Sequence, residues 1–91
     1  MEYKPDQNKV PKWFDGSIYE DGGYVTNPFT GAGVDLTNVE LSVYDFIKGA
    51  EAVLNHTALP ASEAKKLTRT FRRALSWFGN ANSEAYMVLL D

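Results

Sequence analysis

Positively charged side chains concentrate in one short stretch of the sequence, residues 64–79, which reads AKKLTRTFRRALSWFG. If this stretch is helical, its five cations fall on one continuous arc of about 120°, opposite an apolar stripe. Cations beside an aromatic ring that can stack on a base are the components of a nucleic-acid-binding surface. The candidate residues are Lys65, Lys66, Arg69, Arg72, Arg73 and Trp77.

The same pattern is also typical of the solvent-facing side of a core helix. Arg72 and Arg73 suit the negative end of the helix dipole, whereas Lys65 and Lys66 in the first turn oppose the dipole by about a few tenths of a kcal/mol. Trp77 can widen the apolar stripe, and the net charge of −3 is unlike that of most nucleic-acid-binding domains. We therefore favour a plain helix face or a protein contact, with nucleic-acid binding as the alternative.

The distribution of charge along the chain leaves both interpretations open. Residues 1–64 carry a formal charge of −6 and residues 65–91 a charge of +3. Such asymmetry indicates either a binding surface or two halves that attract each other. If Glu40, Asp45 or Glu51 pairs with the arginines, the surface for nucleic acid is lost.

No residue pattern in the sequence is typical of an active site. The chain has no cysteine, which excludes disulfides, thiolate metal sites and cysteine nucleophiles. The single histidine, His56, is expected in the last turn of a helix, where it suits the dipole. Asp15, Glu20 and Asp21 fail the spacing of a calcium loop and favour turns instead. We expect a non-enzymatic protein with no metal and no cofactor.

The N-terminal half has the composition of a flexible arm followed by short strands. Residues 1–12 are polar and contain two prolines, so we expect a flexible arm before a single domain over residues 13–91. Asp21-Gly22-Gly23 predicts a two-residue hairpin turn, and NPFTG predicts a second turn with Gly31 in a left-handed conformation. The predicted strands lie at about 17–20, 23–27 and 32–36.

The C-terminal half has the periodicity of helices. Thr37 and Glu40 match a capping box, and a helix is predicted over 38–55, in which Gly49 costs about 1 kcal/mol unless a close neighbour requires it. A second helix is predicted over 61–78, with Ser62 as the N-cap and Gly79 as its end.

The last stretch, AYMVLL, is expected to form a short helix capped by Asn80 or Asn82, with a buried strand as the alternative. The expected fold is therefore α+β: an N-terminal β-hairpin or meander packed on an antiparallel helix pair, with a short C-terminal helix.

Apolar side chains outside the predicted core sector suggest self-association. A chain this short has a small core, so a homo-oligomer is a reasonable way to bury more surface. A phage or host protein is the other candidate partner. AYMVLL is far shorter than a bilayer span, so no membrane contact is expected. The candidate interface residues are Leu41, Tyr44, Tyr86 and Leu89.

Two stretches, VTNPFTGAGVDLTNVELSVYDFI and FRRALSWFGNANSEAYMVLLD, resemble small proteins encoded by marine tailed bacteriophages. The function of that family is unknown, so the resemblance assigns no role to any residue. It implies a setting in the cytoplasm of an infected bacterium or in the virion. It also favours an accessory binding or assembly protein over an enzyme.

Overall fold

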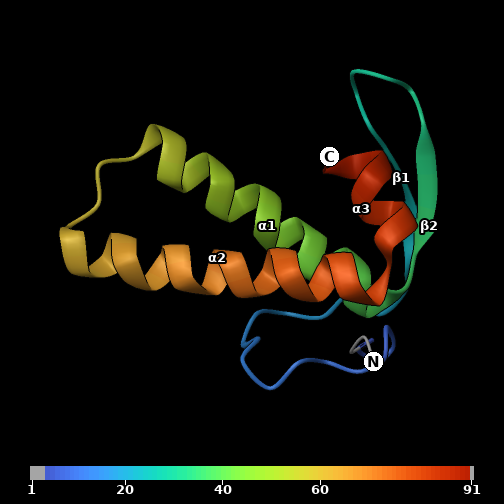
Figure 1. The fold of residues 1–91 in the computed structure, drawn as a ribbon, viewed down its shortest axis with the longest axis horizontal. Coiled ribbons are helices and arrows are strands. Elements are labelled where there is room, and N and C mark those ends of the chain that lie inside the picture. Colours follow the sequence, from blue (N-terminus) through green and yellow to red (C-terminus); the bar gives the residue numbers. More distant parts are fainter. Residues whose placement is uncertain (1–3, 91) are drawn as a thin grey trace.

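The computed structural model describes residues 4–90 of the 91-residue chain. In this part of the chain a β-hairpin is followed by three helices (Figure 1), so the predicted α+β class is confirmed. None of these helices is long and apolar enough to cross a membrane. The elements are, in order, β1 (Gly23–Thr26), β2 (Gly33–Leu36), α1 (Asn38–His56), α2 (Ala61–Ala81) and α3 (Ser83–Leu89).

The hairpin is formed by β1 and β2, which pair antiparallel with Val25 opposite Val34. Its turn is closed by two backbone hydrogen bonds of 2.8 Å, from Gly31 N to Asn27 O and from Asn27 N to Ala32 O. Gly31 has a φ of 78°, a conformation that glycine adopts without strain, and this confirms the prediction for the NPFTG turn.

The strand predicted at 17–20 does not form, so of the predicted hairpin or meander the structure has the hairpin. Tyr19 N donates to Ser42 Oγ at 2.9 Å, and Tyr19 O accepts from Asn38 Nδ2 at 3.1 Å. The backbone of this segment is therefore satisfied by side chains of α1 rather than by a neighbouring strand.

The hairpin turn predicted at residues 21–23 does not form either, because the strand that would precede it is absent. Gly22 is instead explained by a close approach of two backbones. A Cβ atom at this position would lie 2.0 Å from the carbonyl oxygen of Leu36, at the end of β2. Only glycine allows the chain to pass this close.

The first helix, α1, begins at the predicted capping box and ends one residue later than predicted. Thr37 Oγ1 accepts from Glu40 N at 3.1 Å, and Glu40 Oε1 accepts from Thr37 N at 2.9 Å. Glu40 is only 1% exposed, and its Oε2 has no hydrogen-bond partner among the described residues. The buried apolar face of α1 consists of Val39, Val43, Ile47 and Ala50.

The second helix, α2, is three residues longer than predicted, because Gly79 does not end it. A Cβ atom at Gly79 would lie 3.3 Å from the ring of Tyr86, so this glycine lets α3 pack closely against α2. The predicted cap is also wrong. Pro60 occupies the N-cap position without a side-chain hydrogen bond, and Ser62 lies inside the helix.

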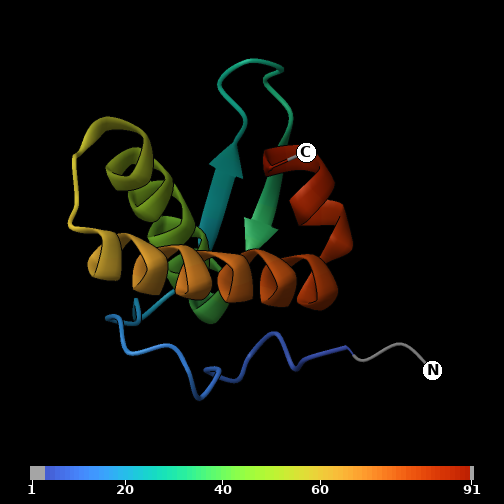
Figure 2. The same ribbon diagram turned by 60° about the vertical axis from the view of Figure 1, so that its left-hand side comes forward.

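The AYMVLL run forms α3, so the predicted short helix is confirmed. Its N-cap is Asn82, whose Oδ1 accepts a hydrogen bond from Ala85 N at 3.1 Å. This cap turns the chain directly from α2 into α3, which folds back against the hairpin (Figure 2).

The core lies where the C-terminal half of α2 meets the start of α1, α3 and the hairpin. The two long helices are antiparallel, and in Figure 1 they separate toward the loop that joins them at 57–60. Within α2, the buried residues begin only at Ala74, and Phe71 packs partly buried against the same core, so the part of the helix before Phe71 extends beyond the core. The buried cluster consists of Phe14, Leu36, Val39, Val43, Ile47, Ala74, Trp77, Phe78, Ala81, Ala85 and Leu89.

Candidate nucleic-acid interface

The five cations of α2 are all exposed, and none of them is paired with an acid among residues 4–90. In that part of the chain the only ion pair joins Lys48 and Glu51 of α1, at 3.6 Å. Glu40 is buried in its capping box, and Asp45 accepts a hydrogen bond from the Tyr19 hydroxyl at 2.9 Å. The three acids considered as partners of the arginines, Glu40, Asp45 and Glu51, are therefore engaged elsewhere.

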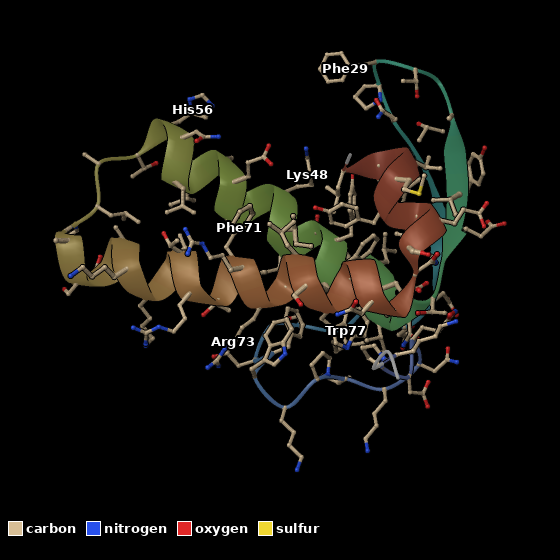
Figure 3. All side chains as sticks on the ribbon, in the orientation of Figure 1. Phe29, Lys48, His56, Phe71, Arg73 and Trp77 are labelled. Atoms are coloured by element: carbon tan, nitrogen blue, oxygen red, sulfur yellow. The ribbon has the colours of Figure 1, made fainter. Side chains whose placement is uncertain are left out.

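Trp77 does not have the exposed ring that a stacking role requires. It is 8% exposed and belongs to the core cluster. Figure 3 shows Trp77 and Arg73 pointing from α2 toward the N-terminal segment. Of the two roles considered for Trp77, the structure therefore agrees with a wider apolar stripe.

The N-terminal segment lies along α2, on the side away from α3 and the hairpin tip (Figures 1 and 2). Pro5 is buried, and the carbonyl oxygen of Gln7 accepts a hydrogen bond of 2.7 Å from Thr37 Oγ1. Phe14 is 9% exposed and makes an edge-to-face contact with Phe46, with ring centroids 6.0 Å apart. Both ends of residues 5–14 are therefore anchored to the core.

A shallow groove of about 490 Å³ separates this segment from α2. The α2 wall consists of Arg73, Ser76, Trp77 and Asn80, whose spacing places them on one helix face. The opposite wall consists of Pro5, Asp6, Lys9, Val10, Pro11, Lys12 and Trp13.

The groove continues into a second hollow on the solvent side of α2. Arg73 and Ser76 line both, and the second hollow adds Lys65, Arg69 and Arg72. Among residues 4–90, the charged side chains that line the two surfaces are six cations and one carboxylate, Asp6. We call the cationic set the basic strip; its members are Lys9, Lys12, Lys65, Arg69, Arg72 and Arg73.

The basic strip includes residues that the sequence interpretation missed. Lys9, Lys12 and Trp13 lie in or beside the segment expected to be a flexible arm, yet they form a wall of the groove. The local signal was present, because two lysines stand within four residues of a tryptophan in KVPKW. Conversely, Lys66 was a candidate and is exposed, but it does not line either surface.

His56 lies at the end of α1, on the opposite side of the helix pair from Arg73 (Figure 3). It is exposed and occupies the last turn of the helix, as expected. Between residues 4 and 90, no group of three or more His, Cys, Asp or Glu side chains is placed to hold a metal ion.

The four residues expected at a protein interface pack against the core of the single chain. Leu89 is 7% exposed, while Leu41, Tyr44 and Tyr86 are partly buried against the same cluster. Each therefore offers a partner only part of its side chain. The large apolar side chains that are most exposed are Phe29 at the hairpin tip (Figure 3), at 95%, followed by Met87 and Tyr24.

Comparisons with known protein families, with curated protein sequences and with solved structures give no match for this chain. A function must therefore be inferred from the arrangement of the chain's own residues.

Proposed function

We propose that this chain is a non-enzymatic binding protein that binds nucleic acid along the basic strip. The observation that carries the proposal is the concentration of six cations, without an ion-pair partner in residues 4–90, around a single carboxylate. This concentration occurs in a protein whose net charge is −3. Like charges held side by side repel one another and lower stability, and a polyanion removes that penalty.

The chemistry of the strip suits phosphate groups. Three of its six members are arginines, and a guanidinium binds two phosphate oxygens at once in a fixed geometry. The strip begins on the half of α2 that extends beyond the core, where a large ligand meets no obstruction from α3 or the hairpin.

The length of the strip also fits a nucleic-acid backbone. On α2 the strip runs from Lys65 to Arg73, and the helix rises about 12 Å over that length at 1.5 Å per residue. One strand of a duplex places a phosphate about every 3.4 Å, so about four phosphates face such a length. The strip has four cations on this part of α2, Lys65, Arg69, Arg72 and Arg73.

The test is a titration of the protein into labelled single-stranded and duplex DNA at about 50 mM and about 200 mM salt. We expect micromolar binding that weakens steeply with salt. The triple variant Arg69→Ala/Arg72→Ala/Arg73→Ala should bind much more weakly, and the matched triple lysine variant should keep most of the affinity. Lys48→Ala, which removes an exposed cation on α1, is the control and should bind normally. Failure of the wild-type protein to bind either DNA would refute the proposal.

The second candidate function is that of a self-associating assembly protein. It is favoured by the exposed apolar side chains Phe29, Tyr24 and Met87, since contacts between chains would cover them. Light scattering on the same samples tests it. A mass of two or more chains without DNA binding would support this candidate, with a second copy or a phage or host protein as the partner.

The proposed setting is the cytoplasm of an infected bacterium or the virion. Its support is the resemblance of two stretches of the sequence to proteins of tailed phages. Nucleic acid is abundant in both places, so the setting agrees with the proposed ligand.

A further inference from the structure

We infer that the groove between residues 5–13 and α2 holds an unpaired base, so that the protein prefers single-stranded nucleic acid. This inference rests on the proposed function, because the basic strip supplies most of the affinity. The groove adds a site that distinguishes single strands from duplexes.

The lining of the groove matches the chemistry of a base. Its apolar part consists of aromatic and proline rings with one valine, which suits a flat aromatic ligand. Ser76 and Asn80 add a hydroxyl and an amide, which can hydrogen-bond to the polar edge of a base. The apolar side chains are Pro5, Val10, Pro11, Trp13 and Trp77.

Cations flank this apolar lining on both walls of the groove, where they can pair with the phosphate groups of the bound nucleic acid. Lys9 and Lys12 lie on one wall and Arg73 on the other, so a nucleotide in the groove has cations on both sides. Arg73 also belongs to the hollow on the solvent side of α2. A strand that leaves the groove at Arg73 therefore meets the rest of the basic strip.

Trp13 is the residue that can stack on the base. It is partly exposed in the groove, in contrast to the buried Trp77. Its ring makes an edge-to-face contact with Phe14, with centroids 5.9 Å apart and an angle of 89° between the planes. Phe14 is in turn fixed against Phe46. The indole is thus held in place before the ligand binds, which lowers the entropy cost of binding.

The groove selects single strands because only an unpaired base can offer its face to an indole. In a duplex, the faces are stacked on neighbouring pairs. An acidic peptide matches the charge of the strip but brings no flat ring, so it gains nothing from Trp13.

The experiment compares three probes: an oligothymidylate of about 12 nucleotides, a duplex of the same length, and polyglutamate as a competitor. Anisotropy gives the affinity, and intrinsic fluorescence reports on the two tryptophans. We expect the single strand to bind about tenfold more tightly than the duplex, since one stacked base contributes about that factor. We also expect it to quench the tryptophan fluorescence.

Two variants at Trp13 assign these effects. Trp13→Phe keeps an aromatic ring, so it should keep most of the affinity but lose most of the quenching, because the tryptophan that stacks on the base is gone and the remaining Trp77 is 8% exposed. Trp13→Leu keeps an apolar side chain without a ring. It should lower single-strand affinity about tenfold while leaving duplex affinity and the salt dependence unchanged.

A variant on the groove rim keeps the test independent of folding. Lys9 and Lys12 are exposed, so Lys9→Ala/Lys12→Ala should fold normally and weaken single-strand binding more than duplex binding. Equal affinities for single strand and duplex, or polyglutamate competing as well as DNA, would overturn the inference about the groove. If both DNA probes bind equally, the proposed function stands, and if neither binds, the proposed function itself fails.

Discussion

The hydroxyl of Thr37 donates a hydrogen bond of 2.7 Å to the carbonyl oxygen of Gln7, thirty residues earlier in the chain. The Thr37 hydroxyl oxygen also accepts a hydrogen bond from Glu40 N in the capping box of α1. One side chain therefore both starts a helix and fixes the segment that forms a wall of the groove. The shape of the groove depends on this helix cap.

Removing the Thr37 hydroxyl should lower stability and loosen the groove together. We expect Thr37→Ala to reduce the free energy of unfolding by about 1–2 kcal/mol, because it removes an N-cap and a long-range hydrogen bond. Thr37→Ser keeps the hydroxyl and is the control. Urea denaturation measures the stability, and equal losses in the two variants would show that the methyl group matters instead.

Asn27 should connect the hairpin turn to α3. Its Oδ1 accepts from Phe29 N at 2.8 Å, and its Nδ2 donates to Val88 O at 3.0 Å. Asn27→Asp keeps the acceptor and removes the donor, so we expect a loss of about 1 kcal/mol. Asn27→Ala removes both and should cost more. Thermal denaturation ranks the stabilities of the two variants. If Asn27→Asp is as stable as the wild type, the hydrogen bond to α3 does not contribute to stability.

Gly49 lies at an exposed position of α1 where no neighbour requires a glycine. Beyond its own helix turn and chain neighbours, a Cβ atom there would meet no atom of residues 4–90 within 4 Å, so that part of the chain holds no close neighbour of the kind considered from the sequence. We expect Gly49→Ala to raise the free energy of unfolding by about 0.5–1 kcal/mol, through higher helix propensity and a less flexible unfolded chain. Gly22→Ala is the opposite control, because its Cβ would collide with the backbone of Leu36. An unchanged midpoint for Gly49→Ala in chemical denaturation would contradict this.

The helices could be predicted from the sequence because their signals are local. The capping box of Thr37 and Glu40 and the apolar periodicity after it lie within a few turns, and α1 follows them closely. The prediction that Gly79 ends α2 failed because the role of this glycine depends on Tyr86, which lies in a different helix. A glycine that ends a helix and one that makes room for a neighbour look the same in a sequence.

The missing strand and the groove could not be predicted because both depend on contacts between residues far apart in the sequence. Tyr19 bonds to Asn38 and Ser42, about twenty residues away, and no alternation of side chains reveals that. The basic face of α2 was visible as a pattern. Its extension by Lys9 and Lys12 depends on how the N-terminal segment is anchored, which only the fold determines.

The Tyr19 side chain should give a pH-dependent contribution to stability. Its hydrogen bond to Asp45, with the negative charge of that carboxylate and partial burial, raises the pKa of Tyr19 above 10.0. Because the folded pKa is the higher one, the contribution is fully present below pH 10 and is lost as pH rises through the raised value.

An ultraviolet titration of the wild type against Tyr19→Phe isolates this group. The difference curve should place its midpoint above pH 10, and Asp45→Asn should move that midpoint back toward the ordinary value. The stability advantage of the wild type over Tyr19→Phe should likewise shrink above pH 10. A midpoint that Asp45→Asn leaves in place would show that the carboxylate is not the cause.

The salt dependence of binding should count the cations that contact phosphate. If all six members of the basic strip do so on a single strand, the logarithm of the affinity should fall with the logarithm of salt with a slope of about −4. The triple alanine variant at Arg69, Arg72 and Arg73 removes half of them, so its slope should fall to about −2. The triple lysine variant keeps every charge, so its slope should match the wild type even where the loss of bidentate contacts lowers its affinity. A triple alanine variant that binds more weakly at an unchanged slope would mean that these arginines do not displace counterions from the strand, and the strip would then have to be redrawn around Lys9, Lys12 and Lys65.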